Sequence, residues 1–250
     1  MNEFRTSKTP ETRFAQEAEA LREVPQPSAL NVNHVKEGEA EEVAGIGWLR
    51  SFYTEASDAW DRLNKLRTSV RPELTKTAHQ MEVNKAFETA TKRVGRARDT
   101  AQERIKESAQ KYRNDLDLAT GLATTGKHDQ ELRQVLRSMN ERDRYQALVQ
   151  AIDNGDTDTM RAALTAPALA VGIPADKLAN FRKSWERKAA PEIVQKIERL
   201  DQAQEQLTNG FSTWLEDGDK LAYSKEIREA QKAAEQHEKT MQGFESEEVA

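Results

Sequence analysis

Apolar residues recur at helical spacing along most of this chain. Between Glu73 and about Ala119 they repeat every eleven positions, and Gly95 is the only Gly or Pro in that stretch. Eleven residues make almost three turns of an α-helix, so such rows form one stripe along a single rod. The pattern predicts one long helix over residues 72–120. Its rows are Val83, Val94, Ile105 and Leu116; Ala86 and Ala97; and Ala90, Ala101 and Tyr112.

A second amphipathic pattern covers residues 45–71 and contains large aromatic side chains. Pro72 follows it, which predicts that the helix ends at or before Arg71 and that Pro72 lies in the first turn of the next one. The apolar face needs a partner, which is either the chain's own long helix, another protein or, less favoured, a membrane interface. The candidate protein-binding residues are Trp48, Phe52, Trp60 and Leu63.

Two further helical regions follow a turn rich in Gly and Thr. Residues 127–190 combine short apolar patterns with Gly and Pro and predict a small helical unit, in which Asp156 is expected to cap a helix. Residues 191–215 carry a seven-residue apolar repeat with Gln204 in its seam, which predicts a coiled-coil-like helix. We expect Asn209 and Gly210 to interrupt this helix.

The two ends of the chain are polar. Residues 1–44 contain three Pro and scattered apolar positions, and we expect a disordered N-terminal arm. Residues 216–250 are expected to form a weak acidic helix that ends in a disordered tail. Only 36% of the chain is hydrophobic, 32% is charged, and the mean hydropathy is −0.88. The predicted fold is therefore all-α and elongated, with a long central helix, flanking helices, a small compact unit and disordered termini.

Charge is distributed unevenly along the chain. Residues 66–115 contain 12 Lys and Arg against 7 Asp and Glu, whereas residues 200–250 contain 5 against 12. The densest basic cluster consists of Lys92, Arg93, Arg96 and Arg98. These residues are candidates for contacts to a phosphate backbone, although interleaved acidic residues are typical of a solvated helix face. Nucleic-acid binding or regulation through this helix is the alternative function.

No residue pattern points to catalysis. The chain has no Cys, its four His are far apart in sequence, and no nucleophile elbow or glycine-rich phosphate loop is present. We therefore predict a protein that is not an enzyme and that uses no cofactor or metal. There is no apolar run long enough for a transmembrane helix and no secretory signal, so the expected location is the cytoplasm.

One stretch resembles proteins of tailed bacteriophages. The residues that carry the resemblance are Ala166, Pro167, Ala168, Leu169, Gly172, Ile173 and Pro174, followed by Phe181, Arg182 and Trp185. They are similar to small helical modules of phage proteins, and the layout of the whole chain resembles phage scaffolding and minor virion proteins. The resemblance implies a location in the host cytoplasm or the virion.

The sequence favours a structural or assembly protein. We expect it to associate with copies of itself as a homo-oligomer and to bind a protein partner through its helices. The aromatic residues of 45–71, the stripe of the long helix and the lack of catalytic motifs motivate this hypothesis.

Overall fold

A computed structural model describes residues 24–36, 38–69 and 74–222 of the chain. Within these ranges every regular element is a helix, which confirms the predicted all-α fold with a long central helix. The chain forms two compact units, and each is described by itself below. The bend expected at Arg71 and Pro72, residues 1–23 of the N-terminal arm and the tail from residue 223 onward lie outside the described residues.

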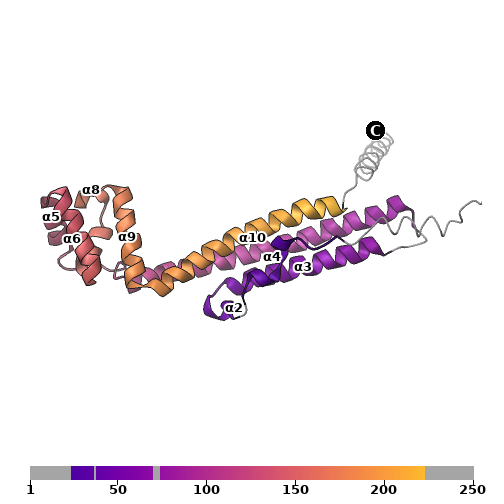
Figure 1. Cartoon of the computed structure of the whole chain (residues 1–250), viewed down its shortest axis with the longest axis horizontal. Coiled ribbons are helices and arrows are strands. Elements are labelled where there is room, and N and C mark those ends of the chain that lie inside the picture. Colours follow the sequence, from indigo (N-terminus) through magenta and orange to yellow (C-terminus); the bar gives the residue numbers. More distant parts are fainter. Residues whose placement is uncertain (1–23, 37, 70–73, 223–250) are drawn as a thin grey trace, which may run out of the picture. The chain divides into compact units, whose positions relative to one another are not determined.

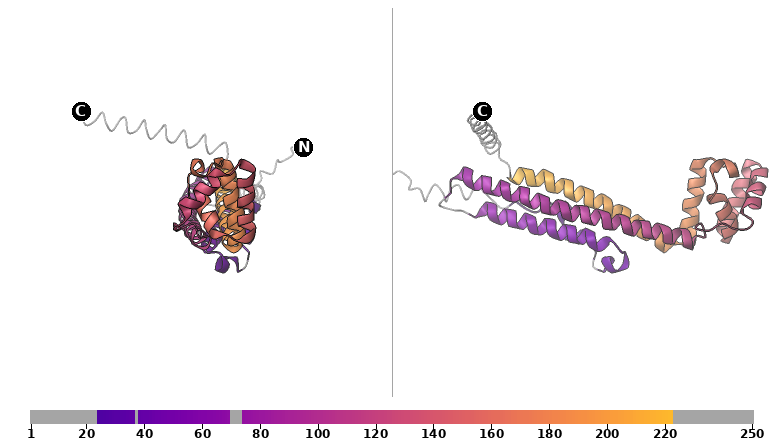
Figure 2. Two further views of the ribbon diagram at one scale, coloured as in Figure 1. Left: turned by 90° about the vertical axis from the view of Figure 1, so that its left-hand side faces the viewer. Right: turned by 180° about the vertical axis from the view of Figure 1, so that it is seen from behind.

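Unit 1 is a bundle of three helical segments that lie side by side (Figures 1 and 2). It contains α3 (Ile46–Thr68) from Gly47 onward, α4 (Lys76–Ala119) up to Gln102 and α10 (Pro191–Ala222) from Glu205 onward. Its core is aromatic. The Trp214 ring of α10 lies edge-on to the Trp60 ring of α3 at 6.1 Å between centroids, and it stacks on Phe87 of α4 at 5.9 Å. All three segments therefore meet at one aromatic cluster.

The long helix α4 continues through Gly95 without a break. It begins at Lys76, and its 44 residues span about 66 Å at 1.5 Å per residue. The predicted row from Val83 to Leu116 is buried at all four positions, whereas the two alanine-rich rows are mostly half-buried. Phe87 belongs to none of the rows, yet its ring lies against α10.

The expected interruption of α10 at Asn209 and Gly210 was wrong, because the helix runs on to Ala222. A β-carbon at Gly210 would lie 3.1 Å from the Phe52 ring and 3.2 Å from the Tyr53 ring. A glycine inside a helix costs about 1 kcal/mol relative to alanine. Here it allows α10 to approach α3 closely, so the glycine serves packing and does not end the helix.

The described part of the N-terminal arm differs from the expected disorder. It forms two 3-10 turns, η1 (Ser28–Leu30) and η2 (Val32–His34), and the short helix α2 (Glu39–Glu42). Leu30 is completely buried, and both Trp60 Nε1 and Asn64 Nδ2 donate hydrogen bonds to the Val24 carbonyl, at 3.2 and 2.6 Å. Sequence periodicity missed this segment because single apolar residues and backbone hydrogen bonds hold it.

Unit 2 contains residues Ala40–Ile46 and Glu103–Gln204, so it is larger than the predicted unit at 127–190. It takes the last part of α4 and the first part of α10, and the Trp185 Nε1 donates to the Thr120 carbonyl at the end of α4 at 3.1 Å. Leu148, Met160 and Val171 are completely buried in its core. The short helices of unit 2 are α5 (Asp129–Ser138), α6 (Glu141–Asn154), α7 (Thr157–Leu164), α8 (Ala168–Val171) and α9 (Ala175–Ala189).

Turn and cap residues set the boundaries of these short helices. The Asp156 side chain accepts a hydrogen bond from the Thr159 amide and caps α7, as predicted. Gly155 and Gly172 end α6 and α8 in the left-handed conformation that favours glycine. Local sequence therefore determines these three helix ends in unit 2.

Candidate helix-binding grooves

The four candidate protein-binding residues of α3 differ in their exposure to solvent. Phe52 and Trp60 are completely buried in unit 1 and Leu63 is 3% exposed, whereas Trp48 is 43% exposed. Packing on the chain's own helices, one of the alternatives for this face, is therefore what the structure shows for three of the four. Trp48 alone among them presents a large surface to solvent.

A groove runs between α3 and α4 in unit 1. Its volume is about 560 Å³. Its apolar lining consists of Ala59, Leu63, Leu66, Ala86 and Ala90. Three of these five side chains are alanine, so the two helices leave a shallow channel where larger residues would fill the space. Such a channel suits the side chains of another helix.

Polar contacts hold α3 and α4 together near both ends of the groove. At one end His79 Nε2 lies 3.2 Å from the Arg67 carbonyl. At the other, Arg93 Nε lies 2.5 Å from Glu55 Oε1 and Arg93 Nη2 donates to Glu55 Oε2 at 2.9 Å. The bidentate geometry orients both side chains at this end of the groove.

The charged residues lining the α3/α4 groove are of both signs. They are Glu55, Arg62, Glu82, Lys85 and Arg93. An apolar floor bordered by mixed charges is typical of a surface that binds an amphipathic helix, because the floor takes the apolar face and the border sets the register.

A second groove of about 590 Å³ lies between α4 and α10, also in unit 1. Its floor is formed by Phe87, Thr91 and the 39% exposed Leu215. Its charged residues are Glu88, Lys92, Glu216 and Asp219. Three carboxylates against one ammonium make this groove acidic, which distinguishes it from the α3/α4 groove.

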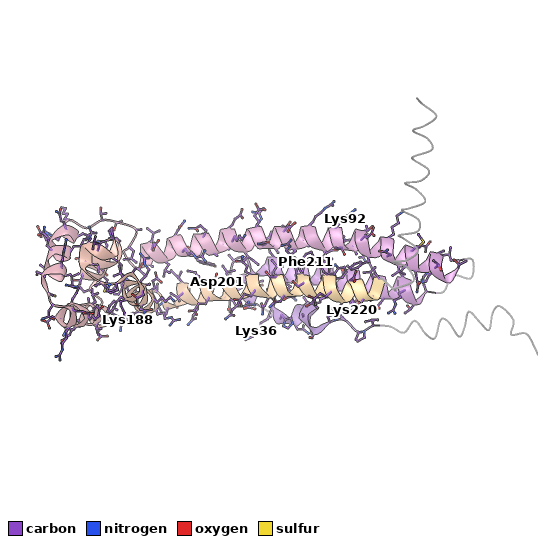
Figure 3. The ribbon with its side chains drawn as sticks, turned by 90° about the horizontal axis from the view of Figure 1, so that it is seen from above. Lys36, Lys92, Lys188, Asp201, Phe211 and Lys220 are labelled. Atoms are coloured by element: carbon purple, nitrogen blue, oxygen red, sulfur yellow. The ribbon has the colours of Figure 1, made fainter. Side chains whose placement is uncertain are left out.

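The four basic candidates on α4 do not form one surface. At 100° per residue, Lys92, Arg93 and Arg96 fall within about 100° of the helix circumference, and Arg98 projects to the other side. The Arg98 guanidinium lies 4.7 Å from the centroid of the Phe211 ring and pairs with Asp99 at 3.0 Å, while Arg93 is bound to Glu55. Figure 3 shows Lys92 pointing away from the bundle and Phe211 lying between α4 and α10. Nucleic-acid binding stays a prediction, with only Lys92 and Arg96 well placed for it.

Trp48 lies on the same line of α3 as the groove residues. It precedes Glu55 by seven positions, which is two helical turns, and Ala59, Arg62 and Leu66 continue the line. The exposed indole therefore extends the apolar floor past the Arg93–Glu55 ion pair.

The buried charges of unit 2 are satisfied within the unit. Asp129 accepts from the Gly126 amide at 2.8 Å and from Arg161 Nε at 3.1 Å, and the Asp129 side chain is 5% exposed. Burial raises the pKa of Asp129, but the Gly126 amide and the Arg161 guanidinium outweigh this effect, so the net pKa is below its ordinary value. An ionised and fully paired carboxylate is suited to hold structure together.

The half-buried Arg144 of unit 2 binds backbone carbonyl oxygens. Arg144 donates to the carbonyls of Leu136 at 2.7 Å, Met139 at 2.7 Å and Arg137 at 3.2 Å, and also to the carbonyl of Gly172. It thereby joins the end of α5 to the end of α8. Four donor contacts of this kind indicate a structural function for the side chain.

Within the described ranges, no group of His, Asp and Glu side chains is arranged to hold a metal ion. In the same part of the chain, no helix combines the length and the apolar character needed to cross a membrane. The sequence analysis did not identify the α3/α4 groove or the Arg144 network. Alanines at three- and four-residue spacing beside charged residues, as at Ala86 and Ala90, are the signal from which the groove could have been inferred.

Comparisons with known proteins identify no relative. No protein-family model, no curated protein and no solved structure matches this chain.

Proposed function

We propose that this chain is a non-catalytic structural or assembly protein that binds amphipathic helices of copies of itself or of a partner in the α3/α4 groove. The groove between Ala59, Ala86 and Ala90 is the observation that carries the proposal. Its alanine floor allows close approach of a third helix, and its mixed charges give that helix a preferred register.

The setting that we propose is a bacteriophage particle or its head assembly. The support is the resemblance of residues 166–174 and of the whole layout to scaffolding and minor virion proteins. That stretch belongs to unit 2, in which the buried Asp129 is paired with Arg161.

Self-association of the full chain tests the proposal. We expect sedimentation equilibrium from low micromolar to millimolar concentration to show a mass that rises with concentration. Ala90→Glu places a carboxylate in the groove floor and should weaken association at least about tenfold, which corresponds to about 1.4 kcal/mol. Ser212→Glu, on the exposed side of α10, is the matched control and should leave association unchanged.

A constant monomer mass in the wild type at all concentrations would exclude self-association. If Ala90→Glu and Ser212→Glu change association equally, the groove is not the binding site. Far-UV circular dichroism of both variants verifies that the helices are retained.

A further inference from the structure

The face of unit 1 that contains the α3/α4 groove has small residues at its middle and opposite charges at its two ends. We infer that α3 and α4 of a second copy of this chain cover this face, in a two-fold symmetric pair in which the two α4 helices lie antiparallel. The inference rests on the proposed function in treating the groove as a helix-binding surface. It adds the identity of the partner and the arrangement of the two molecules.

The middle of the face is formed by alanines of both helices. The polar contacts at the two ends of the groove hold α3 and α4 antiparallel. They place Ala59 of α3 level with the midpoint between Ala86 and Ala90 of α4, to within about 1.5 Å. All three side chains belong to the groove floor. Side chains of this size allow the helices of another molecule to approach closely.

The charges of α4 reverse in sign across this midpoint. Glu82 lies on one side of it and Arg93 on the other, and both line the groove. When a second α4 lies antiparallel over the first about the midpoint, Glu82 of each copy falls level with Arg93 of the other to within about 1.5 Å. Ala86 of each copy falls level with Ala90 of the other. Every contact therefore occurs twice, as a two-fold interface requires.

Arg93 can take part in this contact while it remains bound within its own molecule. Its side chain is 58% exposed although it pairs with Glu55. A guanidinium has five N–H donors, so Arg93 can bind Glu55 of its own chain and Glu82 of the second copy together.

The exposed side of α3 shows a matching reversal about Ala59. Glu55 and Asp58 precede it and Arg62 follows it, and the spacing of three and four residues places all three on one side of the helix. The same two-fold operation places Arg62 of each copy at a level between Glu55 and Asp58 of the other. A surface whose charges reverse about its own midpoint is complementary to a copy of itself.

The parallel arrangement of two copies fits the charges less well. With the two-fold axis along the helices, α4 of the second copy lies over α3, and Lys85 faces Arg62 near the middle of the face. That arrangement adds only an approach of Arg93 to Glu55. In the antiparallel pair the like charges that approach are Lys85 and Lys92, at the solvent edge of the contact, where screening weakens the repulsion.

The exposed Trp48 falls within the same contact. It precedes Glu55 by two helical turns on the groove side of α3, and in the antiparallel pair it lies level with Thr77 and Ala78 of the second copy. Its indole is 43% exposed in the described structure, whereas the other three Trp side chains are buried. The second copy would therefore cover the large apolar side chain that extends the groove floor.

Cysteine cross-linking of the full chain tests the inference, because the chain has no cysteine of its own. Thr89 lines the groove one residue from the midpoint, so Thr89→Cys places one thiol on each side of the two-fold axis. We expect mild oxidation to give a covalent dimer at concentrations at which the wild type self-associates. A disulfide requires α-carbons within about 7 Å, so the readout is strict.

Two control variants separate the antiparallel pair from other contacts. Thr100→Cys is the matched control, because Thr100 lies three turns further along the same side of α4 and is exposed. In the antiparallel pair the two copies of Thr100 are about 36 Å apart along the helix axis, whereas a parallel pair brings them as close as the two copies of Thr89. Glu88→Cys lies next to Thr89 on another side of α4 and measures chance collisions.

We expect Thr89→Cys to form the covalent dimer at least tenfold faster than either control. Equal rates for Thr89→Cys and Thr100→Cys overturn the antiparallel arrangement. Equal rates for Thr89→Cys and Glu88→Cys overturn the contact itself.

Exchange of charges gives a second readout without cysteines. Arg62→Asp sets a carboxylate against Glu55 and Asp58 of the other copy, and we expect self-association at least tenfold weaker by sedimentation. Asp58→Arg sets a guanidinium against Arg62 and should also weaken it. An equal mixture of the two variants should recover association to within about threefold of the wild type, because the new charges then face each other. No recovery in the mixture, with helices retained by circular dichroism, contradicts the inference.

The outcomes distinguish this inference from the proposed function. If Ala90→Glu weakens association but Thr89→Cys reacts no faster than its controls, the groove binds helices in another arrangement and only the inference fails. A wild type that stays monomeric excludes the second copy, and binding in the groove would then require a helix of a different protein.

Discussion

The buried polar groups of unit 1 and unit 2 differ in how completely they are hydrogen-bonded. Among the described residues, the buried side-chain atoms without a hydrogen-bond partner are His79 Nδ1, Asn84 Oδ1 and Arg98 Nε, and all three belong to unit 1. In unit 2 the buried Asp129 is paired with Arg161 and bonded to a backbone amide. The buried polar groups of unit 2 therefore stabilise its interior through hydrogen bonds, whereas the core of unit 1 is stabilised mainly by aromatic packing.

The two described grooves also lie in unit 1. A fully satisfied polar network fixes one arrangement of side chains, because every displaced group would lose its partner. Apolar packing is less directional and tolerates a new helix beside the old ones. Both described grooves therefore lie beside apolar packing in unit 1, whereas the buried Asp129–Arg161 pair lies in unit 2.

Removing the central aromatic side chain of Trp214 should have the largest effect on stability, and this effect should be confined to unit 1. Trp214 is completely buried between Trp60 and Phe87. We expect Trp214→Ala to lower the free energy of unfolding of unit 1 by about 3 to 5 kcal/mol, because it leaves a cavity. Amide exchange read by mass spectrometry measures each unit separately. The neighbouring Leu215→Ala, at a half-exposed site, should cost less than about 1 kcal/mol.

The buried ion pair should be the most sensitive point of unit 2. We expect Asp129→Ala to destabilise unit 2 by about 3 kcal/mol, because Arg161 would lose its buried partner. Asp158 also pairs with Arg161 but is 72% exposed, so Asp158→Ala should cost less than about 1 kcal/mol. Equal losses in the two variants would show that burial does not strengthen the pair.

Lowering the pH should weaken the same ion pair and reduce the stability that it gives to unit 2. The pKa of Asp129 is lower in the folded chain, since the amide and guanidinium contacts outweigh burial. Its stabilisation is therefore complete above the ordinary Asp value of about 3.9 and is lost as the pH falls through the folded value. Urea denaturation of unit 2 should show a smaller stability difference between wild type and Asp129→Ala at pH 3 than at pH 7.

The Arg144 network should give an intermediate effect. Arg144→Ala removes donors to the carbonyls at the ends of α5 and α8, and we expect a loss of about 2 to 3 kcal/mol in unit 2. Arg144→Lys should recover little, because an ammonium cannot reproduce the planar donor geometry. The exposed Arg142→Ala provides the control and should be close to neutral in thermal unfolding.

The smallest expected changes in stability are those of substituting two buried asparagines of unit 1. Asn84 Oδ1 lacks a partner among the described residues, so Asn84→Leu should be neutral or stabilising by up to about 1 kcal/mol. Asn64 instead bonds both the amide and the carbonyl of Val24, and Asn64→Leu should destabilise unit 1 by about 1 to 2 kcal/mol. Chemical denaturation should therefore show a loss of stability for Asn64→Leu and none for Asn84→Leu.

Periodicity predicted the helices of this chain better than it predicted their partners. The row from Val83 to Leu116 and the cap at Asp156 were identified from sequence because each depends on residues within a few turns. The expectation that Gly210 interrupts α10 was wrong. The sequence alone does not distinguish a glycine that ends a helix from one that allows a close contact to Phe52. The α3/α4 groove was missed because it needs the relative rotation of two helices separated in sequence.

The sequence by itself determined an all-helical chain with one long helix, because helical spacing and caps are local properties of the residues. It also indicated the aromatic face of α3. Only the tertiary structure decided that Phe52, Trp60 and Leu63 are buried while Trp48 remains exposed, and that alanines of α3 and α4 meet to form a groove. Burial depends on which helices pack together, and that choice is made by contacts between residues far apart in the chain.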